Sequence, residues 1–265
     1  MYSAAQLAKK YTRHWLSASN SKGHGVHSPF VFHFIKFIKN DLQQYGCYQP
    51  IERLRQQLKQ NKSFIEVADF GAGSTLLKSN RRRIDKMAAS SLKPRKFAQL
   101  LFRIVQYYRP KTMVELGTSF GITSAYLASG NPDARLYTME GAPTIAAIAN
   151  EHFAQLDLKN IELIKGDFTQ TLPELLSQLT QIDFAFVDGN HRKEPTLHYF
   201  EQLLQKSTET SILVFDDIHW SSEMEESWAI IKAHPSVTLS IDLFFIGIVF
   251  LNKDFTIKQH FSLRF

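Results

Sequence analysis

The pattern of apolar and polar positions divides the chain into two parts. From residue 111 onward, short apolar runs alternate with segments of helical periodicity. The runs lie at 112–117, 135–141, 161–166, 182–189 and 211–218, and the helical segments at 122–129, 142–156, 171–179 and 195–205. This alternation predicts parallel strands joined by helices that cover both faces of a sheet. The last apolar stretch, 236–254, contains no helical pattern and predicts two adjacent strands.

The first part of the chain is predicted to be mainly helical. Leu7, Tyr11 and Trp15 recur every four residues, which is typical of an amphipathic helix over 4–17. Further helical patterns follow the prolines at positions 29, 50 and 94, where proline is favoured in a first helical turn. We therefore expect a helical extension over 1–93 and an α/β domain over 94–265.

Charge separates the same two parts. Residues 1–99 hold 18 lysines and arginines against five acids, whereas residues 100–265 hold 13 against 20. Arg81–Arg83 with Lys78 and Lys86 forms the densest basic stretch. Such an excess favours an anionic partner: a charged small substrate, RNA, or a membrane surface contacted by the helix 4–17. A solvated face packed on the acidic domain explains it equally well, and no glycine-rich or aromatic RNA-binding signature supports nucleic acid.

The cysteine content and the lengths of the apolar runs indicate in which compartment to expect the protein. Cys47 is the one cysteine, so an internal disulfide is excluded and a reducing compartment is favoured. No apolar run approaches the roughly 20 residues that cross a bilayer, and the first residues lack a secretory pattern. We expect a cytoplasmic protein, in which Cys47 is a buried or half-buried small apolar residue. Its oligomeric state is open, and a homodimer is one arrangement.

Two glycine-rich turns compete for the role of a nucleotide-binding loop. The sequence "VADFGAGS" begins at Val67, and "MVELGTSFG" ends at Gly121. A binding loop should follow a strand, open a helix, and be followed by a second strand that ends in an acid. The second turn meets these conditions, since its partner strand ends in Glu140. No second strand is expected after the first turn, so Asp69–Ser74 is predicted to be a turn of the basic extension, or a lid or substrate contact.

The second turn reads E-x-G-x-x-x-G, which is not a dinucleotide fingerprint and lacks the P-loop lysine. Together with "LYTMEG", "IKGDF" and "DFAFVDGNH", in this order and at these spacings, it resembles the class I S-adenosylmethionine-dependent methyltransferases. The resemblance covers about residues 94–265. It implies a Rossmann-like, seven-stranded, mostly parallel sheet whose last two strands form an antiparallel pair.

The resemblance also implies which residues bind S-adenosylmethionine. Gly117 and its neighbours would hold the methionine part, Glu140 the ribose, and Asp167 the adenine; an N-cap of the next helix is the other interpretation of Asp167. The full set of expected cofactor-binding residues is Glu115, Gly117, Thr118, Ser119, Gly121, Glu140, Gly141, Asp167, Phe168 and Asp188.

Three carboxylates end the later strands: Asp188, Asp216 and Asp217. Neighbouring parallel strands end at one edge of a sheet, so these acids should converge, and a divalent cation such as Mg²⁺ would relieve their repulsion. They resemble the metal ligands of catechol O-methyltransferase-like enzymes and of sugar O-methyltransferases with a "DG-x-H" motif. His191 occupies the histidine position of that motif and is the candidate general base beside Asp188, with His219 as second candidate. Helix capping or hydrogen bonds to substrate are the metal-free alternatives for the acids.

The leading hypothesis is an O-methyltransferase that uses S-adenosylmethionine, with a divalent metal, on a hydroxyl of a small molecule, an anionic one being an option that the basic extension favours. Two rivals remain. A nucleic-acid methyltransferase would explain the basic extension, although the sequence lacks the N-P-P-Y and paired-cysteine sites of that class. The second rival is a module that binds the cofactor without catalysis and acts through the basic extension at a membrane or partner surface. It would bind the cofactor but show no turnover.

Overall fold

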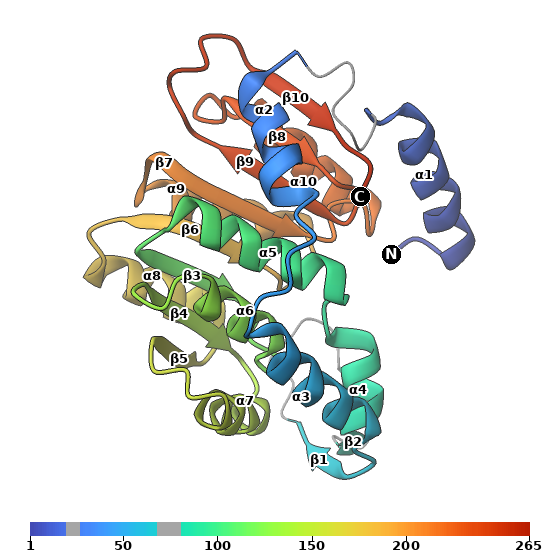
Figure 1. Cartoon of the computed structure of the whole chain (residues 1–265), viewed down its shortest axis with the longest axis vertical. Helices are drawn as coiled ribbons and strands as arrows, with labels where there is room; N and C mark the ends of the chain where they lie inside the picture. Colours follow the sequence, from blue (N-terminus) through green and yellow to red (C-terminus); the bar gives the residue numbers. More distant parts are fainter. Residues whose placement is uncertain (20–26, 68–80) are drawn as a thin grey trace. The chain divides into compact units, whose positions relative to one another are not determined.

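A computed structural model describes residues 1–19, 27–67 and 81–265 (Figure 1). Within it the chain forms two compact units. The central unit is Leu42–Gln178, and the terminal unit combines Met1–Asp41 with Leu179–Phe265. The predicted extension therefore contributes to both units: its first 41 residues belong to the terminal unit and the rest to the central one. The predicted Asp69–Ser74 turn lies outside the described residues.

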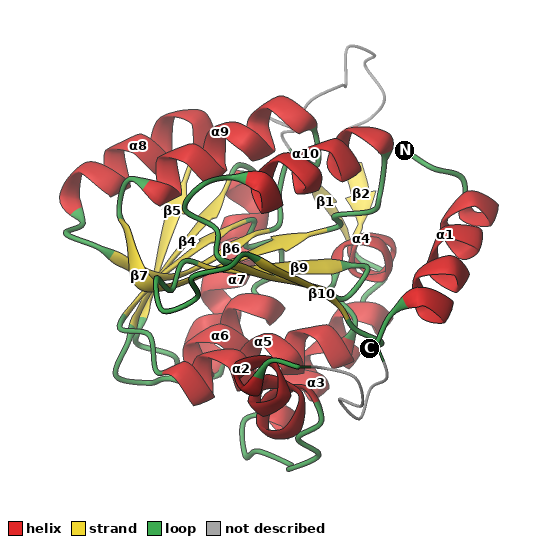
Figure 2. Ribbon diagram, turned by 90° about the horizontal axis from the view of Figure 1, so that it is seen from above, coloured by secondary structure: helices red, strands yellow, loops and turns green. Residues whose placement is uncertain are grey.

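The central unit holds the first βαβ repeats. Its strands run parallel in the order β3-β4-β5. Their bounds are β3 Thr112–Leu116, β4 Arg135–Glu140 and β5 Ile161–Lys165. The helices are α5 Arg95–Tyr108, α6 Ile122–Gly130, α7 Pro143–Gln155 and α8 Phe168–Gln178. Helices α5, α6 and α7 cover one face of these strands and α8 the other (Figure 2). This is the predicted α/β alternation, and the buried side chains of β3 explain why its apolar run is nearly continuous.

The segment before α5 differs from the prediction. It contains α3 Tyr48–Gln60, β1 Phe64–Glu66, β2 Arg81–Arg83 and α4 Ile84–Ser91. The expectation that no second strand follows residue 67 was wrong, since Arg81–Arg83 pairs antiparallel with Phe64–Glu66. Three consecutive arginines give no strand signal, but the Arg81 guanidinium lies 4.6 Å from the centroid of the Phe64 ring, a cation–π contact across the pair. This hairpin is antiparallel and therefore is not a second nucleotide-binding βαβ unit.

In the described part of the terminal unit, the strands follow the order β10-β8-β9-β7-β6. Their bounds are β6 Ile182–Val187, β7 Ser207–Asp216, β8 Leu239–Asp242, β9 Ile246–Phe250 and β10 Gln259–Ser262, and the helices are α9 Lys193–Leu204 and α10 Ser222–Ala233. β6 and β7 are parallel, while β9 is antiparallel to both β7 and β8. The predicted antiparallel pair is thus confirmed. β10 was not predicted; it is short and half polar, and it pairs parallel with β8 at the edge.

Among the described residues before 41, the terminal unit has the helices α1 Ala4–Ser17 and α2 Pro29–His33 and the π-helix η1 Phe34–Lys39. Ser3 and Gln6 close a capping box at the start of α1. One residue of the predicted apolar face of α1 packs within the unit, since the Tyr11 ring lies 5.1 Å from that of Phe244. Across the described residues, no helix combines the length and apolar character that crossing a bilayer requires.

The contact between β9 and α10 makes a packing prediction. A Cβ added to Gly247 would lie 2.7 Å from ring carbons of Trp228, whose side chain is buried. Gly247→Ala should therefore lower the free energy of unfolding by about 1–3 kcal/mol, since overpacked cores relax only at a cost. Gly46→Ala is the control, because nothing lies within 4 Å of its added Cβ. Equal denaturation midpoints for the two variants would contradict this packing.

Candidate functional site

The loop between β3 and α6 has the backbone of a ligand-binding turn. Gly117, Ser119 and Gly121 all have positive φ, at 104°, 48° and 80°. A Cβ on Gly121 would also lie 2.5 Å from Cε1 of Phe153, so glycine is required there on two grounds. Gly121 caps α6, whose first backbone N–H groups are free of intrahelical partners and open toward the loop. Such a turn accepts an anionic or polar ligand group.

Glu140 lies against this loop. Its Oε2 accepts a hydrogen bond from Ser119 N at 2.9 Å, and its Oε1 accepts one from Ala142 N at 2.9 Å. Burial raises the pKa of the Glu140 carboxyl, although hydrogen bonds from the amides of Ala142, Ser119 and Gly141 act in the opposite direction. The structure therefore brings the predicted residues of 117–121 and 140–141 into one place at the ends of β3 and β4.

Glu115 lies beneath the loop. Its side chain is fully buried, and its Oε2 accepts hydrogen bonds from the hydroxyls of Thr138, at 2.6 Å, and of Ser124. The Thr138 hydroxyl is in turn 2.6 Å from that of Thr118 in the loop. Glu115 is thus tied to the loop through a buried chain of hydroxyls. This position allows it to fix the loop conformation from below.

Asp167 follows the third strand of the unit. The positive φ of Gly166, 142°, turns the chain after β5, and Gly166 N donates to Glu140 O. Asp167 Oδ1 then accepts hydrogen bonds from Thr169 N at 2.7 Å and from the Thr169 hydroxyl at 2.6 Å. This is the N-cap geometry that was the second interpretation of Asp167. Phe168, half-buried, is the first residue of α8.

One neighbour of the loop was not predicted. The Ser91 hydroxyl, at the end of α4, lies 3.1 Å from the Ser119 hydroxyl. The apolar pattern does not indicate a helix at 84–91, so Ser91 could not be placed beside the loop from the sequence. It adds a polar group to the surface that a bound molecule would meet.

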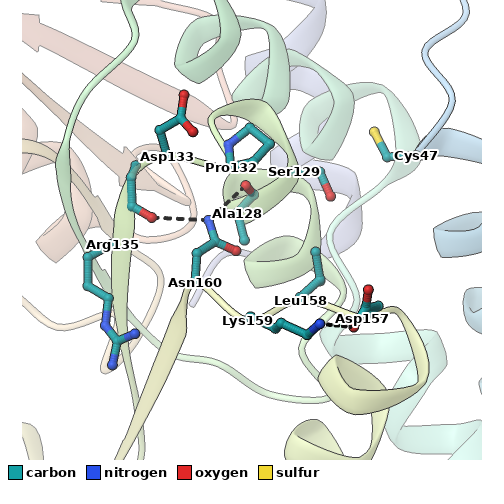
Figure 3. A pocket seen from close by; sticks show the side chains of 11 residues that line it. Cys47, Ala128, Ser129, Pro132, Asp133, Arg135, Asp157, Leu158, Lys159 and Asn160 are labelled. Carbon is teal, nitrogen blue, oxygen red and sulfur yellow. Dashed lines mark hydrogen bonds and ion pairs between the residues drawn. The ribbon is translucent and has the colours of Figure 1, made fainter.

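A cavity of about 680 Å³ in the central unit lies at the other ends of these strands (Figure 3). Arg135, the first residue of β4, and Asn160, just before β5, line it together with Cys47. The Asn160 side chain donates to the carbonyls of Ala128 and Ala134, both at 3.1 Å. Burial raises the pKa of the Cys47 thiol to about 11, so it is an unreactive, half-buried thiol at neutral pH. This cavity is distinct from the glycine loop.

In the terminal unit, the ends of β6 and β7 bring four predicted residues together, here called the acid cluster: Asp188, His191, Asp216 and Asp217. His191 Nε2 lies 3.5 Å from Asp188 Oδ1 and 4.0 Å from Asp217 Oδ2. Asp188, His191 and Asp216 each offer one ligand atom, and these atoms lie within 4.8 Å of one another. Asp216 is buried, while the other three side chains are 18–28% exposed and can meet a ligand.

Strand register explains the cluster. Val187 is paired with Phe215, so Asp188 and Asp216 follow adjacent positions on neighbouring parallel strands. Asn190 has a left-handed backbone, with φ of 53°, which turns the chain so that His191 faces back toward Asp188. Asp217 is also left-handed, at 53°, and its N–H donates to Phe245 O at 2.7 Å. Strand register and local backbone conformation therefore set the position of each residue of the acid cluster.

The donor set of the acid cluster fits a hard divalent cation. Carboxylate oxygens are the ligands that Mg²⁺ and Mn²⁺ prefer, and partly exposed ones leave positions for water or a substrate oxygen. The imidazole of His191 can then act as a base beside the cation.

The second candidate base, His219, is engaged elsewhere. Its Nδ1 lies 3.0 Å from Glu225 Oε1, and its Nε2 lies 2.9 Å from Asp242 Oδ2. Burial lowers the pKa of His219, but the hydrogen bonds and charges of Asp242 and Glu225 outweigh it and raise the pKa above its ordinary value. With both nitrogens bonded to carboxylates, His219 has a structural position rather than that of a free base.

Comparison with known proteins finds similarity to methyltransferases over part of the chain. Residues 114–218 match the family model described as "Methyltransferase domain". The O-methyltransferase imqG of Aspergillus flavus is 30% identical over 114 residues, which are 41% of this chain and 45% of that protein. A transmembrane O-methyltransferase homolog of Rattus norvegicus is 34% identical over 83 residues, which are 30% of this chain and 32% of that protein. The chain thus matches less than half the length of these relatives.

Solved structures give the fold. The SAH-bound methyltransferase PaMTH1 of Podospora anserina aligns with a TM-score of 0.60 at 14% identity, over 96% of this chain and 98% of that one. The O-methyltransferase of Bacillus cereus in complex with SAH aligns with a TM-score of 0.56 at 18% identity, over 79% and 92%. The Rossmann-like methyltransferase fold predicted from the sequence is thereby confirmed.

The buried hydroxyls under the loop give a testable consequence. Thr138→Val keeps the shape of the side chain but removes the donor to Glu115 and the partner of Thr118. We expect a loss of about 1–3 kcal/mol in the free energy of unfolding, because buried polar atoms then lose a hydrogen bond. Thr210→Val, at an exposed position of β7, should change stability by less than about 0.5 kcal/mol. Urea melts of both variants test this, and equal midpoints would show that the network does not support the loop.

Proposed function

We propose, on the premise that residues 114–218 form a methyltransferase domain, that this protein is an S-adenosylmethionine-dependent O-methyltransferase assisted by a divalent metal. The observation that carries the proposal is the acid cluster, in which His191 Nε2 lies 3.5 Å from Asp188 and 4.0 Å from Asp217. A cofactor-binding module without catalysis would have no need of such a set.

The cofactor is assigned to the central unit. Gly117–Gly121 would hold the methionine end, where backbone N–H groups face the ligand, and Glu140 would accept hydrogen bonds from the ribose hydroxyls. Asp167 and Phe168 would lie at the adenine, with the N-cap of α8 fixing that turn. The presence of SAH or SAM in similar structures supports this cofactor.

Methyl transfer is an in-line displacement, in which an acceptor oxygen attacks the methyl carbon and the sulfonium leaves as a neutral thioether. The acceptor must be aligned and must lose its proton, and alignment alone can lower the barrier by several kcal/mol. Asp188, Asp216 and Asp217 would hold a Mg²⁺ or Mn²⁺ ion, which when bound lowers the pKa of a coordinated hydroxyl. His191 Nε2, which faces these acids, would take the hydroxyl proton, and Asp188 would hold the resulting imidazolium at 3.5 Å.

The acceptor is assigned to small hydroxylated molecules. The "DG-x-H" sequence, here Asp188 to His191, supports this class over catechols. The excess of basic residues in the first 99 positions supports an acceptor that carries a phosphate or carboxylate.

Loss of the acids should separate catalysis from cofactor binding. Asp188→Ala and Asp217→Ala should each lower turnover by about a hundredfold or more, because base and cation sites are both damaged. Binding of S-adenosylhomocysteine, measured by calorimetry, should change by less than about threefold, since the glycine loop and Glu140 are intact, although Asp188 is also among the expected cofactor-binding residues. Asp254→Ala, at an exposed loop of the same unit, is the matched control and should keep full turnover.

The same assay separates the metal from the carboxylates. Wild-type protein in excess chelator should lose activity and regain it with Mg²⁺ or Mn²⁺. Full turnover in chelator would show that no metal is required. If Asp188→Ala lost cofactor binding as strongly as turnover, the assignment of catalysis to the acids and of cofactor binding to the glycine loop would be wrong.

Because the pKa of Glu140 is raised, lowering the pH should have opposite effects on two quantities, the stability of the fold and the affinity for the cofactor. A buried acid favours its protonated form in the folded state, so the contribution of Glu140 to stability should rise as pH falls toward the titration of an ordinary glutamate. Cofactor affinity should fall over that same range, because a protonated carboxyl accepts the ribose hydroxyls less well. Glu140→Gln should abolish both dependences.

Thermal shifts with and without S-adenosylhomocysteine, across pH, provide the test. Glu174→Gln on the exposed side of α8 is the control and should behave as wild type. A Glu140→Gln protein with the pH dependence of wild type would exclude Glu140 from the ribose site.

A further inference from the structure

A second group of metal-ligating side chains lies in the terminal unit and shares no residue with the acid cluster. It consists of His14 from α1, His219 from the turn after β7, and Asp242 at the end of β8. Each offers one ligand atom, and these atoms lie within 4.8 Å of one another. We propose that these three residues form a binding site for a transition-metal ion such as Zn²⁺.

In both histidines, one ring nitrogen faces Asp242 and the other faces an oxygen outside the group. His219 places Nε2 2.9 Å from Asp242 Oδ2, and His14 places Nδ1 3.6 Å from Asp242 Oδ1. The other nitrogen of each ring faces an oxygen outside the group. For His219 this is Glu225 Oε1, at 3.0 Å, and for His14 it is the carbonyl of Leu263, at 3.4 Å.

This division is the one that metal-binding histidines need. A ligating imidazole presents one nitrogen lone pair to the ion and donates its other N–H to a carboxylate or carbonyl, which fixes the tautomer and ring orientation. Glu225 and Leu263 O fill those outer positions here, so the inward lone pairs belong to His219 Nε2 and His14 Nδ1. Two imidazoles and one carboxylate suit Zn²⁺, Ni²⁺, Cu²⁺ or Fe²⁺ better than Mg²⁺.

The surrounding groups hold the three ligands in place. Asp242 Oδ2 also accepts from Trp228 Nε1 at 3.2 Å, and its Oδ1 accepts from Phe244 N at 2.8 Å. Glu225 is held in turn by Lys10, at 2.9 Å, and by the Tyr2 hydroxyl, at 2.8 Å. The ligand side chains are 10–20% exposed, so an ion can reach them, and a water molecule would supply the fourth position of a tetrahedral site.

A metal-free cluster has its own stable form, in which an imidazolium of His219 donates Nε2–H to Asp242 and Nδ1–H to Glu225. The metal proposal differs from it in one consequence that can be measured. An ion bound by His14 joins α1 to β8, whereas the imidazolium joins only His219 to its two carboxylates. Metal should therefore protect α1 from proteolysis at its exposed basic residues, Lys9 and Arg13.

Cobalt is the probe, because Co²⁺ occupies Zn²⁺ sites and absorbs visible light when its coordination number is low. The full chain carries the His191→Ala substitution and saturating Mg²⁺, so that the acid cluster does not contribute. We expect one equivalent of bound Co²⁺ with intense visible bands, and its displacement by one equivalent of Zn²⁺.

Variants of the same protein decide the assignment. His14→Gln should weaken Co²⁺ binding by at least about tenfold, and Glu225→Gln, which keeps all three ligands, by about 10–100-fold. His33→Gln is the matched control, since His33 is exposed and outside the group. In limited trypsin digestion, Zn²⁺ should slow cleavage in α1 for the His33→Gln protein and not for His14→Gln.

The overturning results are equally specific. No stoichiometric Co²⁺ binding, or binding that is unchanged in both His14→Gln and Glu225→Gln, would leave the metal-free cluster only. Circular dichroism of each apo variant checks that the fold is intact, and Glu225→Gln keeps the test valid if His14→Gln releases α1. The outcome is independent of methyl transfer, which is assigned to other residues.

Discussion

The constraint on which this structure depends is that adjacent parallel strands end at the same edge, and so gather whatever polar side chains follow them. A carboxylate placed there is partly desolvated and must find donors or positive charge. In the central unit, Glu140 finds backbone N–H groups of the neighbouring loop. In the terminal unit, Asp188 and Asp217 find His191, and the remaining negative charge is what makes a divalent cation a fitting partner.

Each strand-end group is held by packing that permits no other backbone. Gly121 has a positive φ and no room for a side chain beside Phe153, so the loop cannot relax into a standard turn. Glu115 and Thr138 fill the space below it with hydrogen bonds that are lost only at a desolvation cost. The conformation of the loop is therefore supported from below by buried residues.

The alternation of elements and the main strand-end residues could be predicted, because they depend on local periodicity and on one topological rule. Gly117–Gly121, Glu140 and Asp188 all follow apolar runs whose parallel arrangement fixes where they point. Their assigned roles remain predictions. The pairing of Arg81–Arg83 was not predictable, since three charged residues have no apolar alternation, and the Arg81–Phe64 cation–π contact is seen only in the structure.

Long-range contacts were also beyond the sequence. His14 and Asp242 are separated by more than 200 positions, and nothing in their local patterns relates them. Helical periodicity over 29–42 did not reveal the π-helix, whose wider turn shows only in the bond from Asn40 N to Ile35 O. The sequence could not decide between the two roles of Asp167, because capping α8 and binding a ligand both use its carboxylate.

The central claim is that the acid cluster binds the cation at which the acceptor hydroxyl is activated. Anomalous diffraction from crystals grown with Mn²⁺ and S-adenosylhomocysteine tests it most directly. One strong manganese peak is expected at coordination distance from the carboxylates of Asp188, Asp216 and Asp217. Active protein whose crystals have no peak there, at a Mn²⁺ concentration that supports turnover, would contradict it.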